Sequence, residues 1–202
     1  MNVVANCSVF ITIAIAYLCI RKGSHAKSFH WIKWYCILNA LVEVISFILA
    51  EIKIPNLFVF QFLIIIESII ILNYFKDVST TLNKFINNWV IVGLTFIYLL
   101  HYNSFTNLNP FNAILEGMII FTCCLFFLSD ELKVPKSISI TNEPNFWFIT
   151  ALHIYYGSSW LLLLCAQYVI SENNIFNYVW TAQNILNIFK YIIIFIGLRI
   201  MK

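Results

Sequence analysis

The chain has very few charged residues. Asp, Glu, Lys and Arg make up only 10% of it, whereas an ordinary soluble domain carries about 25%. Hydrophobic residues account for 61%. A chain this apolar cannot cover a surface that faces water on all sides, so we expect lipid to be its solvent. The net charge of +3 is small and spread through the connecting segments. This argues against nucleic-acid binding, which requires a basic face or stripe.

The chain also lacks the motifs of familiar enzymes and metal sites. Its four histidines form no His-Glu-x-x-His sequence, and no nucleophile elbow is present. Its six cysteines contain no Cys-x-x-Cys pair and lie inside apolar stretches. We therefore expect them to be small buried hydrophobic residues. The sequence predicts no catalytic residue and no metal site, and it leaves open whether the protein is an enzyme.

Seven apolar stretches fill most of the chain, and crossing the hydrocarbon core takes about 20 helical residues. The first stretch, Val3 to Ile20, has no basic residues before it and is too long for the apolar part of a cleavable signal. The sequence predicts an all-α, polytopic membrane protein, a single domain over residues 1–202 formed by seven transmembrane helices. The predicted spans are 3–20, 30–50, 57–75, 88–102, 111–128, 146–170 and 177–199.

The basic residues predict the orientation of this bundle. Lys53 is the only cation in one set of connections and ends, and Lys190 lies inside the last span. The other ten cations fall on the opposite side: Arg21, Lys22, Lys27, Lys33, Lys76, Lys84, Lys133, Lys136, Arg199 and Lys202. Connections rich in Lys and Arg stay in the cytoplasm. We expect the N-terminus outside, the C-terminus in the cytoplasm, and the cell membrane, in bacteria the inner membrane, as the location.

Ionisable residues within the spans are candidates for function, because a charge in hydrocarbon costs about 2.5–3.5 kcal/mol on insertion scales. Glu67 and Lys190 both fall near the middle of their spans, so we expect an ion pair or a shared hydrogen bond between them. Such a pair can serve function or simply fasten two helices. His153 adds a titratable group. The last span is the most polar, with Gln183, Asn184 and Asn187 on the same stripe as Lys190.

A second group of polar residues falls in the outer part of the predicted bundle. Glu43 and Glu116 lie there, together with Gln167, Gln183 and His101. These side chains can line a cavity that opens to the outside, or they can be interfacial residues wetted by water. Two acids with amides and aromatic rings suit a small polar or cationic ligand. The hypothesis is a small-ligand site in an outward-facing polar cavity.

Seven helices, an outside N-terminus and Lys190 in the middle of the last helix resemble the microbial rhodopsins. Tyr156 and Trp160 lie where that family packs aromatic residues around retinal, and Arg199 follows near the cytoplasmic end. The resemblance implies retinal on Lys190, with Glu67 as counterion. The chain departs from the family pattern at Leu186, where the family has an acid one turn before the lysine. As a whole the chain resembles bacterial seven-helix inner-membrane proteins that have no assigned activity; apart from retinal, no cofactor is predicted.

Besides a divergent retinal-binding protein and a membrane enzyme, for which the sequence has no motif, three functions remain open at this point. The first is a receptor-like membrane sensor that binds a small ligand and acts through a membrane or cytoplasmic partner protein. The second is a small transporter or channel that uses the intramembrane Glu and Lys residues, although the sequence has no internal repeat of the kind common in transporters. The third is a non-catalytic assembly subunit whose polar residues contact another membrane protein.

Overall fold

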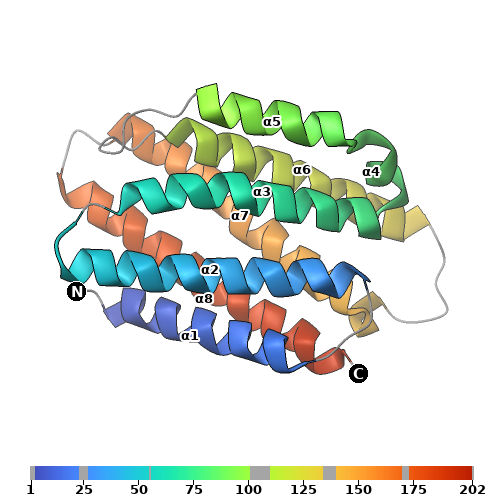
Figure 1. Ribbon diagram of the computed structural model, residues 1–202, viewed down its shortest axis with the longest axis horizontal. Coiled ribbons are helices and arrows are strands. Elements are labelled where there is room, and N and C mark those ends of the chain that lie inside the picture. Colours follow the sequence, from blue (N-terminus) through green and yellow to red (C-terminus); the bar gives the residue numbers. More distant parts are fainter. Residues whose placement is uncertain are drawn as a thin grey trace.

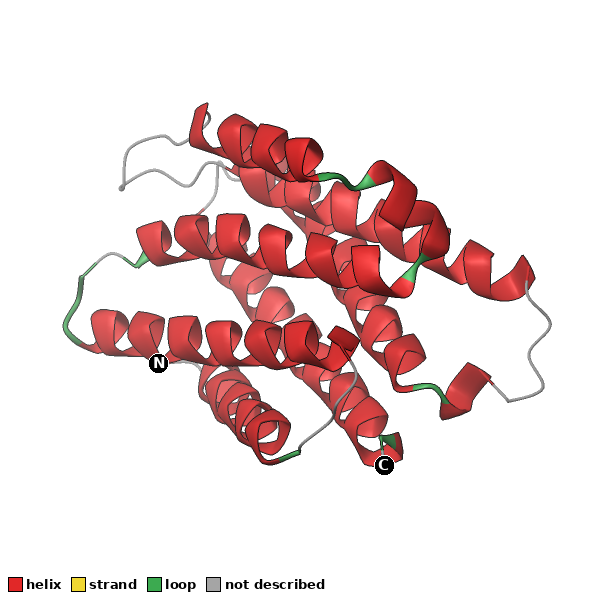
Figure 2. Cartoon of the chain, turned by 45° about the vertical axis from the view of Figure 1, so that its right-hand side comes forward, coloured by secondary structure: helices red, strands yellow, loops and turns green. Residues whose placement is uncertain are grey.

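The computed structural model describes residues 3–22, 27–54, 56–100, 110–133, 140–169 and 173–201. Within these ranges the chain is helical and contains no strand (Figure 2), as the all-α prediction requires. Two short elements are α4 (Thr80–Phe85) and the 3-10 helix η1 (Ile140–Asn142). The longer helices are α1 (Val3–Arg21), α2 (Lys27–Glu51), α3 (Leu57–Val78), α5 (Asn88–Leu100), α6 (Pro110–Lys133), α7 (Pro144–Val169) and α8 (Asn173–Ile200).

Six of these helices, α1, α2, α3, α6, α7 and α8, are long and apolar enough to cross a membrane. The chain is therefore a multi-pass membrane protein by the length and composition of its helices. The fourth predicted span, 88–102, is different. It corresponds to α5, whose 13 residues reach only about 20 Å at 1.5 Å per residue, against a hydrocarbon core of about 30 Å. A seventh span is thus not confirmed, and residues 101 and 102 lie outside the described part of the chain.

The six long helices pack side by side in a closed ring. Going around it, α1 contacts α2, α2 contacts α3, α3 contacts α6, α6 contacts α7, α7 contacts α8, and α8 returns to α1 (Figure 1). Helix α5 lies outside this ring beside α3, and most of its apolar side chains are exposed. Large hydrophobic side chains also cover the outer faces of the other helices, which is the surface that lipid would solvate.

The connection between α3 and α5 contains an element that the sequence did not predict. Helix α4 follows α3 directly, and Ser79 begins it by accepting a hydrogen bond from the backbone N–H of Leu82 at 3.1 Å, as N-cap serines do. Asp130, at the far end of α6, accepts hydrogen bonds from the hydroxyl groups of Ser79 and Thr81, both at 2.7 Å. Local polar contacts therefore fold a segment that lies between the third and fourth predicted spans.

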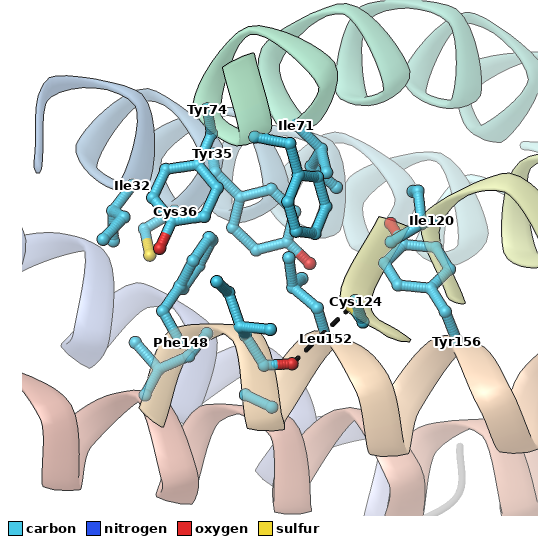
Figure 3. Close-up of a cluster of buried hydrophobic side chains, with 14 of the residues drawn as sticks. Ile32, Tyr35, Cys36, Ile71, Tyr74, Ile120, Cys124, Phe148, Leu152 and Tyr156 are labelled. Atoms are coloured by element: carbon cyan, nitrogen blue, oxygen red, sulfur yellow. Dashed lines mark hydrogen bonds between the residues drawn. The ribbon is translucent and has the colours of Figure 1, made fainter. Parts of the chain in front are cut away.

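The interior of the ring is aromatic at the end where α7 begins. The rings of Tyr35 and Tyr74 both meet Phe148 edge to face, with centroids 5.5 and 4.8 Å apart (Figure 3). The Tyr74 hydroxyl donates to the side-chain oxygen of Asn145 at 3.2 Å. This packing joins α2, α3 and α7.

Candidate functional site

Lys190 is the centre of a polar cluster inside the ring. It lies on α8, and only 1% of its surface is exposed. Its ammonium group sits over three aromatic rings, at 4.2 Å from the centroid of Tyr155, 4.6 Å from Tyr191 and 5.3 Å from Tyr35. Tyrosine faces attract cations, most strongly where water is excluded. Residues from α2, α7 and α8 thus form an aromatic cage around one buried cation.

The predicted ion pair between Glu67 and Lys190 is absent. Among the described residues Lys190 makes no ion pair with a carboxylate. Glu67 is buried on α3, where its carboxylate accepts a hydrogen bond from Asn39 of α2 at 3.3 Å. Of the three carboxylates that interact electrostatically with Lys190, Glu67 has the largest effect, Glu43 the next and Glu116 the smallest. The lysine therefore acts on three acids at a distance and contacts none of them.

Glu116 is a third buried acid, and it lies on α6. Its strongest electrostatic interaction with a charged group is with Glu67, and its interaction with Lys190 is weaker. Glu43 also interacts with Lys190.

A hydroxyl group joins Glu116 to α3 and α5. The Ser68 Oγ atom lies 3.2 Å from the Glu116 carboxylate and 3.2 Å from the Tyr98 hydroxyl. Asn112, one turn before Glu116 on α6, donates to the backbone carbonyl of Tyr98 at 3.1 Å. Tyr98 is also the buried residue of α5, so one contact between this peripheral helix and the ring is made at these polar residues.

Asn187 connects the other end of the cluster to α1 and α2. Its side-chain amide lies within donor distance of the Glu43 carboxylate, at 3.0 Å, and of the Ser8 hydroxyl, at 2.9 Å. Ser8 is fully buried on α1. Gln183, one turn before Asn187, donates to the Tyr155 hydroxyl at 3.1 Å and also to Ser159. Glu43 and Gln183 are half-buried, so this part of the cluster is nearer the surface.

Several buried polar atoms in the cluster have no hydrogen-bond partner. They include the hydroxyl groups of Tyr35, Tyr156 and Tyr191, and the side-chain oxygen of Gln183. In Figure 3 the Tyr35 hydroxyl points away from Phe148, toward the side of the core where Tyr156 lies. Buried polar atoms are nearly always paired in folded proteins, so these atoms have the capacity for further hydrogen bonds.

Three of the predicted site residues make their contacts elsewhere. His153 stacks on the ring of Phe121, with centroids 4.6 Å apart. Asn184 donates to the backbone carbonyl of Trp180 in its own helix at 2.8 Å. Trp160 packs against Gly117 of α6. The structure thus brings together seven predicted residues: Glu43, Glu67, Glu116, Tyr156, Gln183, Asn187 and Lys190.

Most of the predicted residues that meet are buried inside the ring of helices, and the outward-facing cavity stays a prediction. Glu67, Glu116, Tyr156, Asn187 and Lys190 are all buried. We refer to them, together with Glu43, Gln183 and the residues that contact them, as the core polar cluster. His101 and the side chain of Gln167, which we also placed at the cavity, lie outside the described residues.

Sequence reasoning missed several members of the core polar cluster. Tyr35 and Asn39 could have been found, because with Glu43 they recur every four residues and so share one face of a helix. Ser8 and Tyr98 carry no such signal, because each lies in a helix that is otherwise mostly apolar. Within the described ranges, no group of three or more His, Cys, Asp or Glu side chains is placed to hold a metal ion.

Comparison with known proteins does not identify a relative. The chain matches no protein-family model, and neither a curated protein nor a solved structure is similar to it at a significant level. The functional argument therefore depends on the geometry of the core polar cluster.

Proposed function

We propose that this protein is a receptor-like membrane sensor that binds a small polar or cationic ligand in the core polar cluster and acts through a partner protein. The observation that carries the proposal is the set of unpaired hydroxyl groups around Lys190. Tyr35 and Tyr191, whose rings face the lysine ammonium, present buried, unpaired hydroxyls. Among the described residues the ammonium has no carboxylate within ion-pair distance. A small ligand with hydrogen-bonding groups would pair these atoms.

The arrangement of the cluster also suits a sensor. Its side chains come from α1, α2, α3, α6, α7 and α8, and Tyr98 adds α5. A ligand that binds there would contact or rearrange most helices of the bundle at once. A ligand that binds one arrangement of the helices more tightly than another shifts the population toward the first. The cytoplasmic ends of the helices would then carry the change to the partner.

We further propose seven passes with the N-terminus outside, in the inner membrane of a bacterium. Helices α1 and α8 pack together, and the first begins at the opposite end of the bundle from the end of the second (Figure 1). A chain whose ends lie on opposite sides crosses an odd number of times. Six long helices are an even number, which favours a seventh crossing by the segment that contains α5. The distribution of Lys and Arg supports the orientation.

A transporter is the second candidate, favoured by the depth of the acids. Glu67 lies ten residues after the first residue of α3 and eleven before its last, which places it about midway across the bundle. Transporter sites commonly lie at this depth. Against this, the helices around the cluster are continuous in the described ranges, whereas transporter sites are often formed by broken helices.

Native mass spectrometry of the protein in mild detergent, with an absorbance spectrum of the same sample, tests the sensor proposal. We expect a small non-covalent adduct on the wild-type protein that is lost in Lys190→Met. The matched control is Asn184→Ala on the same helix, which should keep the adduct because Asn184 bonds its own backbone.

The alternatives give different spectra in the same experiment. A covalent adduct on Lys190 with visible absorbance would replace the proposal by the retinal alternative. A protein-only complex of fixed stoichiometry would replace it by the assembly subunit. An adduct that persists in Lys190→Met would place the ligand outside the core polar cluster.

A further inference from the structure

The ends of α1 and α8 bring three cations to one edge of the bundle. Helix α1 ends at Arg21, and the ammonium group of Lys22, the next residue, donates a hydrogen bond to the backbone carbonyl of Leu198 in the last turn of α8. Arg199 follows Leu198 in that turn, so this contact holds both arginines where the two helices end together (Figure 1). We refer to Arg21, Lys22 and Arg199 as the terminal basic triad.

Both arginines of the triad are exposed and lie beside aromatic rings. Each guanidinium group sits over a ring one turn earlier in its own helix, Arg21 at 5.4 Å from the centroid of Tyr17 and Arg199 at 6.0 Å from that of Phe195. The rings themselves are 55% and 39% exposed. Aromatic faces attract cations, so these contacts hold each guanidinium group against apolar surface.

An apolar stripe leads up to each arginine. The large exposed apolar residues before the arginines recur every three or four positions, as Phe10, Ile13 and Tyr17 on α1 and as Phe189, Ile192 and Phe195 on α8. Residues at this spacing share one face of a helix, and α1 and α8 pack against each other. Two neighbouring stripes that lipid would cover therefore end in the same group of cations.

The nearby acids do not balance the terminal basic triad. Of the described acids at this end of the bundle, Asp77 is paired with Lys27 at 2.9 Å. Asp130 and Glu131 lie on α6, across the ring from α1. Glu143 lies just before α7, which is the neighbour of α8. Even with the charge of Glu143 counted, one acid stands against three cations.

We propose that the terminal basic triad binds the phosphate head group of an anionic phospholipid, whose acyl chains lie along the exposed stripes of α1 and α8. Charge complementarity selects an anionic lipid, since each Lys or Arg beside an anionic membrane surface adds to binding. Guanidinium groups bond phosphate oxygens in a bidentate manner, and an ammonium group has three donors, of which Lys22 gives one to Leu198. The inference goes beyond the proposed function, because it involves no residue of the core polar cluster.

Native mass spectrometry of the purified full-length protein tests this with two added lipids. Phosphatidylglycerol and phosphatidylcholine with the same acyl chains are supplied in equal amounts, and we expect the wild type to retain phosphatidylglycerol in preference. Arg21→Gln with Arg199→Gln should lower that retention at least about tenfold. The matched control, Lys84→Gln with Lys133→Gln, removes the same charge from exposed positions of α4 and α6 and should keep the lipid.

Thermal unfolding of the same proteins gives an independent measurement. Phosphatidylglycerol should raise the wild-type melting temperature above its value in phosphatidylcholine, and added salt should reduce this shift. The shift should shrink in the double arginine variant. That variant should melt like the wild type in phosphatidylcholine, because both arginines are exposed, and this shows that it is folded.

Three results would overturn the inference. Equal retention of the two lipids by the wild type would show that the site does not select a negative charge. An equal loss in the control pair would show that only total charge matters. Displacement of the lipid by inorganic phosphate at the same concentration would show that the acyl chains contribute nothing. A phospholipid adduct should persist in Lys190→Met, and its mass distinguishes it from the ligand of the core polar cluster, so the two proposals fail separately.

Discussion

The ammonium group of Lys190 lies 4.2 Å from the centroid of the Tyr155 ring, while the Tyr155 hydroxyl accepts a hydrogen bond from Gln183. The same tyrosine thus contacts the buried cation with its ring face and an earlier turn of α8 with its hydroxyl. A lysine in a membrane helix needs such compensation, because its charge is unfavourable in hydrocarbon. Here aromatic faces supply it at close range and carboxylates supply it at longer range.

Removing the charge of Lys190 should destabilise the protein strongly. Lys190→Met leaves Glu67 and Glu43 without their nearest cation, and removal of one partner from a buried charged group costs about 3–5 kcal/mol. Neutralising Glu67 in the same chain, as Lys190→Met with Glu67→Gln, should recover at least half of that loss. Unfolding by detergent titration measures both. A double variant as unstable as the single one would mean that Glu67 and Lys190 do not compensate each other.

Asn187 should contribute more to stability than Asn184, although the two lie one turn apart. Asn187 is buried between Glu43 and Ser8, whereas Asn184 bonds its own helix. Hydrogen bonds between membrane helices are worth about 0.6 kcal/mol on average and up to about 1.7. We expect Asn187→Ala to cost about 1–2 kcal/mol and Asn184→Ala less than about 0.5 in the same unfolding assay. Equal losses would show that the bridge to α1 and α2 carries no stability.

Two glycines provide a matched test of helix packing. A Cβ atom added at Gly117 would lie 2.7 Å from the Cβ of Trp160, closer than packed atoms allow, so α6 and α7 would have to separate. We expect Gly117→Ala to lower stability by about 1–3 kcal/mol. At Gly93 of α5 an added Cβ would meet nothing within 4 Å, so Gly93→Ala should be neutral or stabilising by up to about 1 kcal/mol. Thermal unfolding of both variants checks the contrast, which a destabilised Gly93→Ala would contradict.

Labelling of single introduced cysteines tests the proposed seven passes. Lys53 lies between α2 and α3, and Lys84 lies in α4, at opposite ends of the bundle. Lys53→Cys should react with a membrane-impermeant maleimide in intact cells, and Lys84→Cys only after permeabilisation. Ser104→Cys, after α5, should behave like Lys53→Cys. The parent protein, whose native cysteines remain, is the control for background. If Ser104→Cys instead behaves like Lys84→Cys, α5 does not cross the membrane.

The sequence by itself determined the class of protein and the positions of its helices. Lipid requires apolar stretches of a certain length, and such stretches can be read from consecutive residues, so six predicted spans match the long helices of the structure. The fourth was harder to read because α5 is short and lies outside the ring. Charged residues within the spans were also found easily, since each is a conspicuous exception to an apolar sequence.

Tertiary structure alone decided which of these polar residues meet. Depth along a helix can be counted, which suggested that Glu67 and Lys190 were partners. The direction in which each side chain points depends on how neighbouring helices are rotated, and this placed three tyrosines around the lysine and Asn39 beside Glu67. Rotation is set by packing between residues far apart in the chain, such as Trp160 against Gly117. For the same reason Ser8 and Tyr98 could join the cluster without any local signal in the sequence.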